Sequence, residues 1–301
     1  MLKGIDVSEH QGVIDWNKVK DHVDFAMLRA GHGKNNIDKQ FERNIKECNR
    51  LGIPVGIYWF SYALNEDMAR QEAKYALAAV KNYRLEYPIS FDLEYDTLNY
   101  AKKNGVNIDK RLATNMVKAF CSEIEAAKYY AMNYTNQDFI NNHFYFNEIE
   151  RYCPWYAWYN KELDRSNVGM WQYSESGSIP GIDGHEVDLD YARVDFARYI
   201  RDRHLNNIDK IKQFSNTNYQ KEYTEYGKCT VITNSGLNIR ALPSIGSEIV
   251  GKYIKGESVI YDYVVWNEDY VWISWIGGKS GKRRYMAVRN LKTGVVWGEC
   301  V

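Results

Sequence analysis

The sequence has no excess of charge of either sign, because 39 Lys and Arg residues balance 39 Asp and Glu residues. Binding to nucleic acid requires a basic surface, so we expect no nucleic-acid partner. The 5 cysteines are widely spaced and form no Cys-x-x-Cys pair, which indicates neither a zinc site nor a disulfide framework. Their odd number is typical of a protein made in a reducing cytoplasm.

Long hydrophobic runs are also absent. The longest apolar-rich run, residues 53–64, is too short to span a membrane, so we expect no membrane insertion. Residues 1–6 lack the charged and apolar regions of a signal peptide. The sequence has neither a calcium-binding EF-hand loop nor a His-x-x-x-His pair, and we expect no metal and no other cofactor.

Hydrophobic residues occupy 45% of the 301 positions, which is enough to bury a sizeable core. The length suits one large domain and one small domain. Aromatic residues reach 15% and include 25 Tyr and 9 Trp, whose rings pack in cores or stack on flat ligands.

Residues 1–204 alternate strand-like and helix-like segments and form the predicted large domain. The eight expected strands are 3–8, 24–30, 54–60, 87–94, 128–134, 155–159, 169–173 and 185–190. The expected helices are 15–21, 39–51, 66–83, 110–127 and 191–203. Asp38 can cap the second helix and Gly52 can end it. This alternation predicts the α/β class, and because the helices thin out after residue 140, we expect an irregular TIM-like β/α barrel.

Residues 205–228 are rich in Asn, Lys, Gln and Tyr without a clear period, and we expect a linker there. Residues 229–301 form short alternating segments separated by turns that contain glycine. These segments are 231–233, 236–240, 258–265, 270–275 and 284–288. About 70 residues of this kind predict a second, small all-β barrel.

The most informative stretch is Asp92-Leu93-Glu94, at the end of the apolar segment 88–94. Side chains alternate along a strand, so Asp92 and Glu94 share one face, with Cα atoms roughly 6.5–7 Å apart. Like charges this close repel each other, so a gain in stability does not explain the pair. Two neighbouring carboxyl groups are what acid–base chemistry on a glycosidic bond requires.

Acidic side chains also occur at two other expected strands, where Asp6 and the pair Asp188 and Asp190 lie opposite apolar residues. The functional site of a barrel lies at the C-terminal ends of its strands, so these acids should converge. Two alternatives stay open. The acids could be a solvated rim or helix N-caps, Asp190 in particular. They could also bind a cation together with His185.

Aromatic residues occur on or just after other expected strands of the large domain. Tyr58 lies on strand 54–60 and Tyr62 follows that strand. Tyr134 ends another strand, and Trp171 lies on a third. Sugar rings have apolar faces, so such side chains at a barrel mouth would line a saccharide cleft. Packing in the core is the alternative for each of them, because the sequence does not say which face of a strand looks inward.

Residues 2–203 resemble the family 25 glycoside hydrolases, the lysozyme group typified by fungal and bacteriophage muramidases. The resemblance depends on segments that occur in the order of that family: 4–12, 29–31, Asp38 with Phe41, 52–58, 92–94, 134–136, 171–173 and 187–190. It implies hydrolysis of the β-1,4 bond between N-acetylmuramic acid and N-acetylglucosamine in peptidoglycan.

The resemblance also implies roles for single residues. Glu94 would be the acid and base, with a pKa that neighbouring carboxyl groups raise. Asp92 would stay ionised, and either orient the N-acetyl group of the substrate or stabilise the transition state. Asp6 and Asp188 would complete the electrostatic field. The implied sugar contacts are Tyr58, Tyr62, Tyr134, Trp171, Gln172 and Asp190.

Residues 229–301 resemble a bacterial SH3-like cell-wall-binding domain, through segments 237–244, 270–274 and 284–289. Four aromatic residues are candidates for contact with the wall, although a small barrel also uses aromatic residues in its core. They are Trp266, Trp272, Trp275 and Tyr285.

Together the two resemblances predict a peptidoglycan hydrolase of the phage endolysin type that lyses Gram-positive hosts. Without a signal peptide, such an enzyme would stay in the host cytoplasm until a holin-type membrane hole lets it reach the cell wall. The alternatives are a bacterial autolysin, a non-catalytic glycan-binding protein on the same barrel, and an enzyme that acts on chitin.

Overall fold

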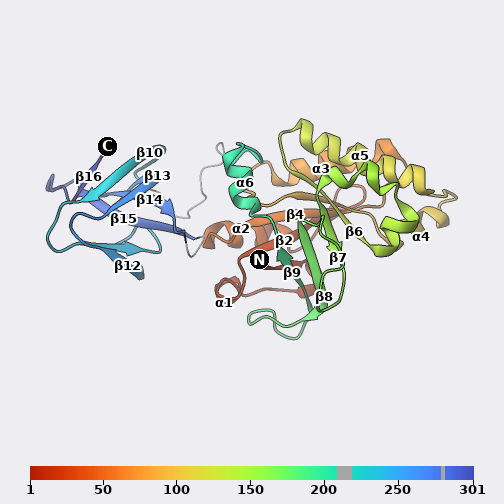
Figure 1. Cartoon of the computed structure of the whole chain (residues 1–301), viewed down its shortest axis with the longest axis horizontal. Helices are drawn as coiled ribbons and strands as arrows, with labels where there is room; N and C mark the ends of the chain where they lie inside the picture. The colour runs from red at the N-terminus through yellow and green to blue at the C-terminus, as the bar shows by residue number, and fades with distance from the viewer. Residues whose placement is uncertain (209–218, 279–281) are drawn as a thin grey trace. The chain divides into compact units, whose positions relative to one another are not determined.

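The computed structural model describes residues 1–208, 219–278 and 282–301. The chain folds as two compact units whose boundary falls between residues 208 and 219, and each unit is described by itself (Figure 1). Within the described ranges, no helix is long and apolar enough to cross a membrane.

The first unit is a closed barrel in which each strand is hydrogen-bonded to two neighbours. In residues 1–208 the strands of the barrel are β1 (Leu2–Val7), β2 (Phe25–His32), β4 (Val55–Phe60), β5 (Ile89–Asp92), β6 (Ala131–Asn136), β7 (Pro154–Ala157), β8 (Met170–Gly177) and β9 (Val187–Ala192). Pairing of β1 with β2 closes the ring, and the short β3 (Asn36–Ile37) joins β2 at the edge. Strand β9 is antiparallel to both of its neighbours, and the rest of the ring is parallel. The predicted α/β class and irregular barrel are therefore confirmed.

Most helices of the barrel unit fall between the strands β1 and β6, and one follows β9. They are α1 (Trp16–Val19), α2 (Phe41–Leu51), α3 (Glu66–Val80), α4 (Tyr95–Lys103), α5 (Lys110–Ala126) and α6 (Phe196–Asp202). Short helical turns are found at Glu9–Gln11, Phe139–His143, Phe146–Glu148 and Glu150–Tyr152. Helix α4 has no counterpart among the expected helices. The loss of long helices after residue 140 agrees with the sequence pattern.

Local sequence signals explain where several helices begin and end. Asn65 accepts a hydrogen bond from the N–H of Met68 at the start of α3, and Asp109 does the same for α5. Gly52 ends α2 with a φ of 70°, a left-handed conformation that favours glycine. Asp38 lies two residues before the Gln40 N-cap of α2, where one of its oxygens accepts the N–H of Gln40.

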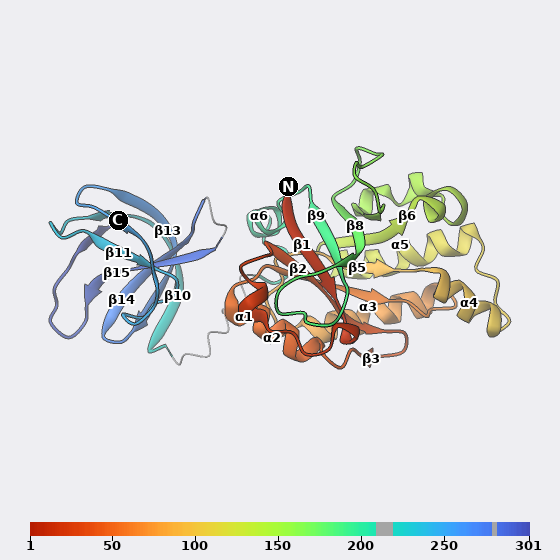
Figure 2. The same ribbon diagram turned by 90° about the horizontal axis from the view of Figure 1, so that it is seen from below.

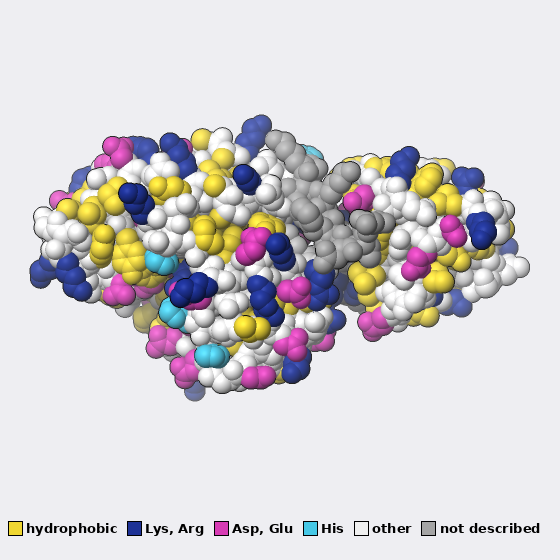
Figure 3. Space-filling view, turned by 180° about the vertical axis from the view of Figure 1, so that it is seen from behind, with side chains coloured by type: hydrophobic (Ala, Val, Ile, Leu, Met, Phe, Trp, Pro, Cys, Tyr) yellow, Lys and Arg dark blue, Asp and Glu magenta, His cyan; other side chains and the backbone are white. Residues whose placement is uncertain are grey.

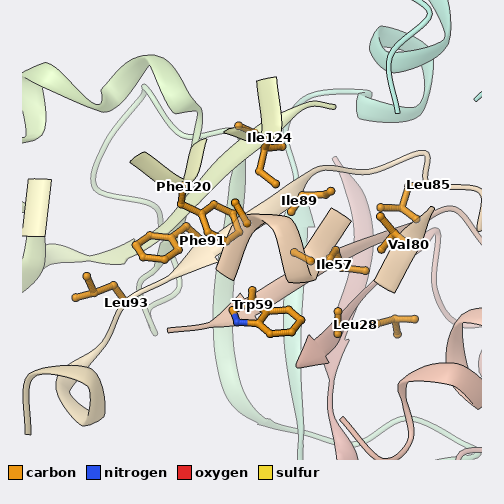
Figure 4. Close-up of a cluster of buried hydrophobic side chains, with 14 of the residues drawn as sticks. Leu28, Ile57, Trp59, Val80, Leu85, Ile89, Phe91, Leu93, Phe120 and Ile124 are labelled. Atoms are coloured by element: carbon orange, nitrogen blue, oxygen red, sulfur yellow. The ribbon is translucent and has the colours of Figure 1, made fainter. Parts of the chain in front are cut away.

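The main core lies between the strands and helices α3 and α5 (Figure 4). On β5, Phe91 points into this core, where its ring lies 4.6 Å from that of Phe120. Ile89 and Leu93 share its side of the chain and are buried as well. The intervening residues, Ser90 and Asp92, therefore face the interior of the barrel, as the alternation predicted.

Two expected boundaries near the end of the barrel are wrong. The helix expected from residue 191 begins at Phe196 with Asp195 as its N-cap, because residues up to Ala192 continue β9. Of the expected linker 205–228, residues 209–218 lie outside the described residues, and the described parts on either side belong to the two units. Asn206 is buried and its side chain binds the backbone of Tyr87 and Tyr130, so this segment belongs to the barrel unit.

The second unit is all-β, as predicted, and its strands are seen in Figure 2. Its sheet has the order β12-β11-β15-β14-β13-β10-β16 within the described residues. The strands are β10 (Lys221–Val231), β11 (Leu237–Arg240), β12 (Ile249–Tyr253), β13 (Ser258–Asn267), β14 (Tyr270–Ile276), β15 (Arg283–Asn290) and β16 (Gly298–Cys300). Most of β10 falls in the expected linker, and β12 and β16 were not expected.

A disulfide bond joins Cys229 to Cys300 in this unit, which corrects the expectation that the cysteines form no disulfide. The two residues are directly paired between β10 and β16, although 71 positions separate them in the sequence. Only the register of the two strands brings them together, so their spacing along the chain gave no sign of the bond.

We predict that Phe91→Ala lowers the free energy of unfolding of the barrel unit by about 3–5 kcal/mol, because it leaves a cavity between β5 and α5. Phe91→Leu should cost clearly less, since it keeps most of the buried volume. Denaturant unfolding followed by circular dichroism would measure both changes. Equal stability of the Phe91→Ala variant and the wild type would contradict this packing.

Candidate active site

The acidic residues predicted from the sequence meet at one mouth of the barrel. Asp6 is near the end of β1 and Asp92 is the last residue of β5, and each is 4% exposed. Asp188 is near the start of β9, directly paired with Asp6. Its position was expected at a strand end. The strand instead starts there, because β9 runs antiparallel to β1 and brings its first residues to the mouth.

Asp92 and Glu94 form a close pair although β5 ends at Asp92. Glu94 is the N-cap of α4, and its backbone is still extended, with φ −127° and ψ −174°. The strand alternation therefore continues one step beyond the sheet and keeps both side chains on the mouth side. A hydrogen bond joins the two carboxyl groups. The Glu94 side chain also accepts the N–H of Thr97, whose hydroxyl accepts the Glu94 N–H at 3.2 Å.

Gln172 connects the acids to the tyrosines. Its Nε2 donates to Asp6 Oδ2 at 2.8 Å, and its Oε1 accepts from the Tyr134 hydroxyl at 2.8 Å. The same oxygen accepts the Tyr159 hydroxyl at 2.9 Å. The amide is fully engaged, so it fixes Asp6 and two tyrosines in a single arrangement.

Burial of several carboxyl groups in one place changes their protonation. Removal from water, and then repulsion from Glu94 and Asp6, hold the pKa of Asp92 well above its usual range. Burial also raises the pKa of Glu94. Burial and the charge of Asp6 raise the pKa of Asp188 to about 9. The site therefore holds protons at neutral pH.

The raised pKa of Asp92 favours its protonated form, whereas the sequence led us to expect an ionised carboxylate. Burial raises the pKa of both carboxyl groups, and a hydrogen bond joins them, so the pair holds a proton. Such a pair titrates as a unit, so the free site is best described as two carboxyl groups that share one proton. The Arg29 charge lowers the pKa of Asp92 but does not outweigh burial.

Asp190 lies deeper than the other acids and is 0% exposed. Its Oδ1 accepts the indole N–H of Trp155 at 2.8 Å, and a hydrogen bond joins its carboxyl group to that of Asp6. Burial raises its pKa to about 8. Asp190 therefore supports the floor of the site and, in this arrangement, neither caps a helix nor reaches a sugar.

The expected sugar contacts divide into two groups. Tyr58 and Tyr134 contact the Trp155 ring at 5.7 and 5.1 Å, beside the acids. Half-buried Tyr62 lies at the rim. Trp171 is elsewhere, because it is on the other side of β8 from Gln172 and packs with Tyr156 and Val168 in a small separate cluster. Its indole N–H donates to the Trp158 carbonyl, so we no longer count it as a sugar contact.

Several side chains of the mouth were not among the predicted site residues. Tyr62 is surrounded by rings of Phe60, Tyr100 and His32, at 5.3, 5.1 and 5.9 Å. Hydrophobic, acidic and histidine side chains do lie next to one another on the surface of the barrel unit (Figure 3). Phe60 shares the strand face of Tyr58, which was a usable signal. Tyr100 is on the unpredicted helix α4, so nothing in the strand pattern pointed to it.

The sequence left open a cation site formed by these acids together with His185. Within residues 1–208, 219–278 and 282–301, no group of three or more His, Cys, Asp and Glu residues has the arrangement of a metal site. His185, which is in the connection between β8 and β9, lies near Gly12.

In the second unit, three of the four aromatic candidates belong to the core. Trp272, Trp275 and Tyr285 are 1%, 8% and 5% exposed, which corrects their expected contact with the cell wall. A small barrel needs large side chains to fill its interior, and these rings supply them. Trp266 is half-buried, with Lys221 Nζ 4.9 Å from the centre of its ring.

A β/α barrel whose mouth holds paired carboxyl groups among tyrosines has the architecture of a glycoside hydrolase. Comparison with known proteins agrees. Residues 5–182 match the sequence model of glycosyl hydrolases family 25, which is more than half of the chain, and the chain belongs to this family. Residues 221–288 match the bacterial SH3 domain.

Individual relatives cover the barrel unit. The autolytic lysozyme of Clostridium acetobutylicum is 28% identical over 194 residues, which are 63% of this chain and 55% of that protein. The autolysin LytC of Streptococcus pneumoniae, solved with a synthetic peptidoglycan ligand, is 33% identical with a TM-score of 0.58 and covers 63% of this chain and 46% of its own. The CTP1L endolysin, 23% identical with a TM-score of 0.57, shares the fold over 67% of this chain and 70% of its own. The chain thus spans only about half the length of the lysozyme and autolysin that it matches.

Asp190→Asn should flatten the pH dependence of stability. Because the pKa of Asp190 is raised in the folded protein, its contribution to the free energy of unfolding is fully present below about pH 4 and is lost as pH rises through about 8. Between these values the free energy of unfolding falls by up to about 1.4 kcal/mol per pH unit. The amide stays neutral and its oxygen can still accept the Trp155 N–H. Thermal unfolding between pH 4 and 9 would measure the difference. Asp67→Asn, a change at an exposed side chain, is the control and should leave the profile as it is.

Proposed function

We propose that the protein is an N-acetylmuramidase (EC 3.2.1.17), which cleaves the β-1,4 bond between N-acetylmuramic acid and N-acetylglucosamine in peptidoglycan. The observation that carries this proposal is the hydrogen-bonded pair of Asp92 and Glu94 within a buried cluster of acids. A glycan-binding protein without activity gains nothing from carboxyl groups that repel each other and must hold protons.

In this proposal Glu94 is the proton donor. Its side chain is partly exposed, whereas Asp92 is buried behind it, so Glu94 is the carboxyl group that can reach a glycosidic oxygen. Binding of the sugar moves the shared proton from Asp92 to Glu94. Glu94 then protonates the leaving oxygen, and later takes a proton from the water that completes hydrolysis.

Asp92 would orient the N-acetyl group of the substrate. We propose that its carboxyl group, which is 4% exposed beside Glu94, accepts the amide N–H of a bound sugar. The acetamido oxygen can then attack the anomeric carbon in place of an enzyme nucleophile. The negative charge left on Asp92 stabilises the cation that forms, and Asp6 and Asp188 shape the surrounding field. Tyr58, Tyr62 and Tyr134 would contact the sugars.

The domains would divide the work. We propose that the barrel unit cuts the glycan, that the second unit binds the cell wall, and that the tether between them raises the local concentration of enzyme at its substrate. A phage endolysin of a Gram-positive host, released through a holin-type membrane hole, fits the combination of a family 25 barrel with a bacterial SH3 domain. The second candidate is a bacterial autolysin, which the likeness to the clostridial autolytic lysozyme favours.

Glu94→Gln should lower the release of reducing ends from purified peptidoglycan by about 10²–10⁴-fold, because the amide cannot donate a proton to the leaving group. Binding to the wall should not change. Mass analysis of the products identifies the cleaved bond, since a new N-acetylmuramic acid end marks a muramidase. Chitin oligomers tested in parallel separate the alternative substrate. A Glu94→Gln variant as active as the wild type would refute the mechanism.

Trp266→Ala should weaken wall binding without changing chemistry. The half-buried Trp266 is the one of our four aromatic candidates that is not in the core of the second unit, and loss of a single ring costs about 1–3 kcal/mol at a binding surface. Sedimentation with cell walls would show the lost binding, while cleavage of soluble glycan fragments stays constant. Tyr226→Ala, at a tyrosine that is 72% exposed, is the matched control. Unchanged sedimentation of the Trp266→Ala variant would remove this residue from the wall-binding surface.

A further inference from the structure

Another acidic side chain, Glu72, is buried in the barrel unit outside the acid cluster. It lies on α3 and is 3% exposed. No Lys, Arg or His forms an ion pair with it among the described residues, and burial raises its pKa to about 7. A carboxyl group without a cationic partner costs stability when buried, so its contacts should explain its presence.

Glu72 holds the segment that follows β4. Its Oε1 accepts the backbone N–H of Tyr62 at 2.9 Å. The Ser61 side chain lies beside the same carboxyl group and lowers its pKa without cancelling the effect of burial, and Glu72 Oε2 is buried without a hydrogen-bond partner among the described residues. Residues 61–63 have left the sheet, so these side-chain contacts take the place of strand pairing.

The segment that Glu72 holds touches both members of the carboxyl pair. The backbone N–H of Ser61 donates to the Asp92 carbonyl at 2.8 Å. The Ser61 carbonyl accepts the Thr97 hydroxyl at 2.6 Å, and that hydroxyl accepts the Glu94 N–H. Ser61 and Thr97 are both 0% exposed, so no water can replace these bonds. A shift of Ser61 would therefore move the Glu94 carboxyl group relative to Asp92.

The same segment carries Tyr62, whose ring packs against Phe60, Tyr100 and His32 at the rim of the mouth. The Tyr62 N–H that Glu72 accepts lies at the base of this ring. One side chain on α3 thus sets the backbone beneath a proposed sugar contact and beneath the proposed proton donor.

We propose that Glu72 is a positioning residue for the hydrolytic reaction, which fixes Ser61 and Tyr62 and, through Ser61 and Thr97, places Glu94. This inference depends on the proposed muramidase function. Glu72 does not touch the substrate. Its contribution is the geometry of the donor carboxyl group, where a displacement of about 1 Å can cost about 10²-fold in rate.

The test is a set of three variants assayed on soluble peptidoglycan fragments. Glu72→Leu leaves the Tyr62 N–H buried without an acceptor, so the segment must move, and we expect kcat per folded molecule to fall about ten-fold or more. KM should rise as well, because Tyr62 shifts. Glu72→Gln keeps an acceptor oxygen of the same shape, and we expect kcat and KM within about three-fold of the wild type.

Val80→Ala is the matched control for a loss of packing. Val80 is the last residue of α3, about two helical turns beyond Glu72, and is fully buried in the same core (Figure 4). The variant should lower the melting temperature without changing kcat or KM. A merely structural role for Glu72 would give the same pattern in Glu72→Leu, with kcat and KM at wild-type values in the folded protein. That result would overturn the proposal.

If Glu72→Leu does not fold, Thr97→Val tests the same path from the other end. It removes the hydroxyl between Ser61 and Glu94 and should lower kcat with little change in KM, whereas wild-type kcat in this variant would refute the proposed path. Tyr62→Ala should do the reverse and raise KM with little change in kcat. Failure of the proposed function would look different, because the wild type itself would then release no reducing ends.

Discussion

Mutual repulsion of buried carboxyl groups is the constraint on which the rest of this structure depends. Asp6, Asp92, Asp188 and Asp190 lie within one barrel mouth, and burial raises the pKa of each. They coexist because they share protons and because neutral donors are aimed at them, Gln172 at Asp6 and the Trp155 indole at Asp190. Charge is thereby held close to neutral, which suits the proposed role of the site, to give a proton away and take it back.

The barrel produces this crowding through two features of its strands. Alternation along β5 divides apolar from acidic side chains, so the same segment fills the core with Phe91 and the mouth with Asp92. The reversal of β9 then brings the first residues of a strand to the end where β1 finishes, and Asp188 meets Asp6. A fully parallel eighth strand with the same sequence would carry Asp188 to the opposite end of the barrel.

Local pattern was enough to predict the strands of the barrel and the face shared by Asp92 and Glu94, because a period of two depends only on neighbouring residues. It could not predict what depends on partners far away in the sequence. The direction of β9, the role of Asp190 behind Trp155, and the disulfide between Cys229 and Cys300 all follow from strand register. The predictions for the aromatic residues were wrong for a related reason. Trp171 and Trp272 are residue types that are common on ligand-binding surfaces, but strand register places them in a core.

Position of the reacting groups is set from behind the mouth. Asp92 ends a strand and is held by the sheet, but Glu94 begins a helix after the sheet has ended, so its place depends on side-chain contacts. Thr97 and Ser61 supply those contacts, and Glu72 on α3 accepts the backbone N–H of Tyr62, the residue after Ser61. Each link buries a polar group whose loss would leave another without a partner, which makes the arrangement stiff. Burial of the Glu72 carboxyl group in an apolar core costs stability. Its presence is explained by the proposal that it positions the Glu94 carboxyl group, which in the proposed reaction must reach a sugar oxygen.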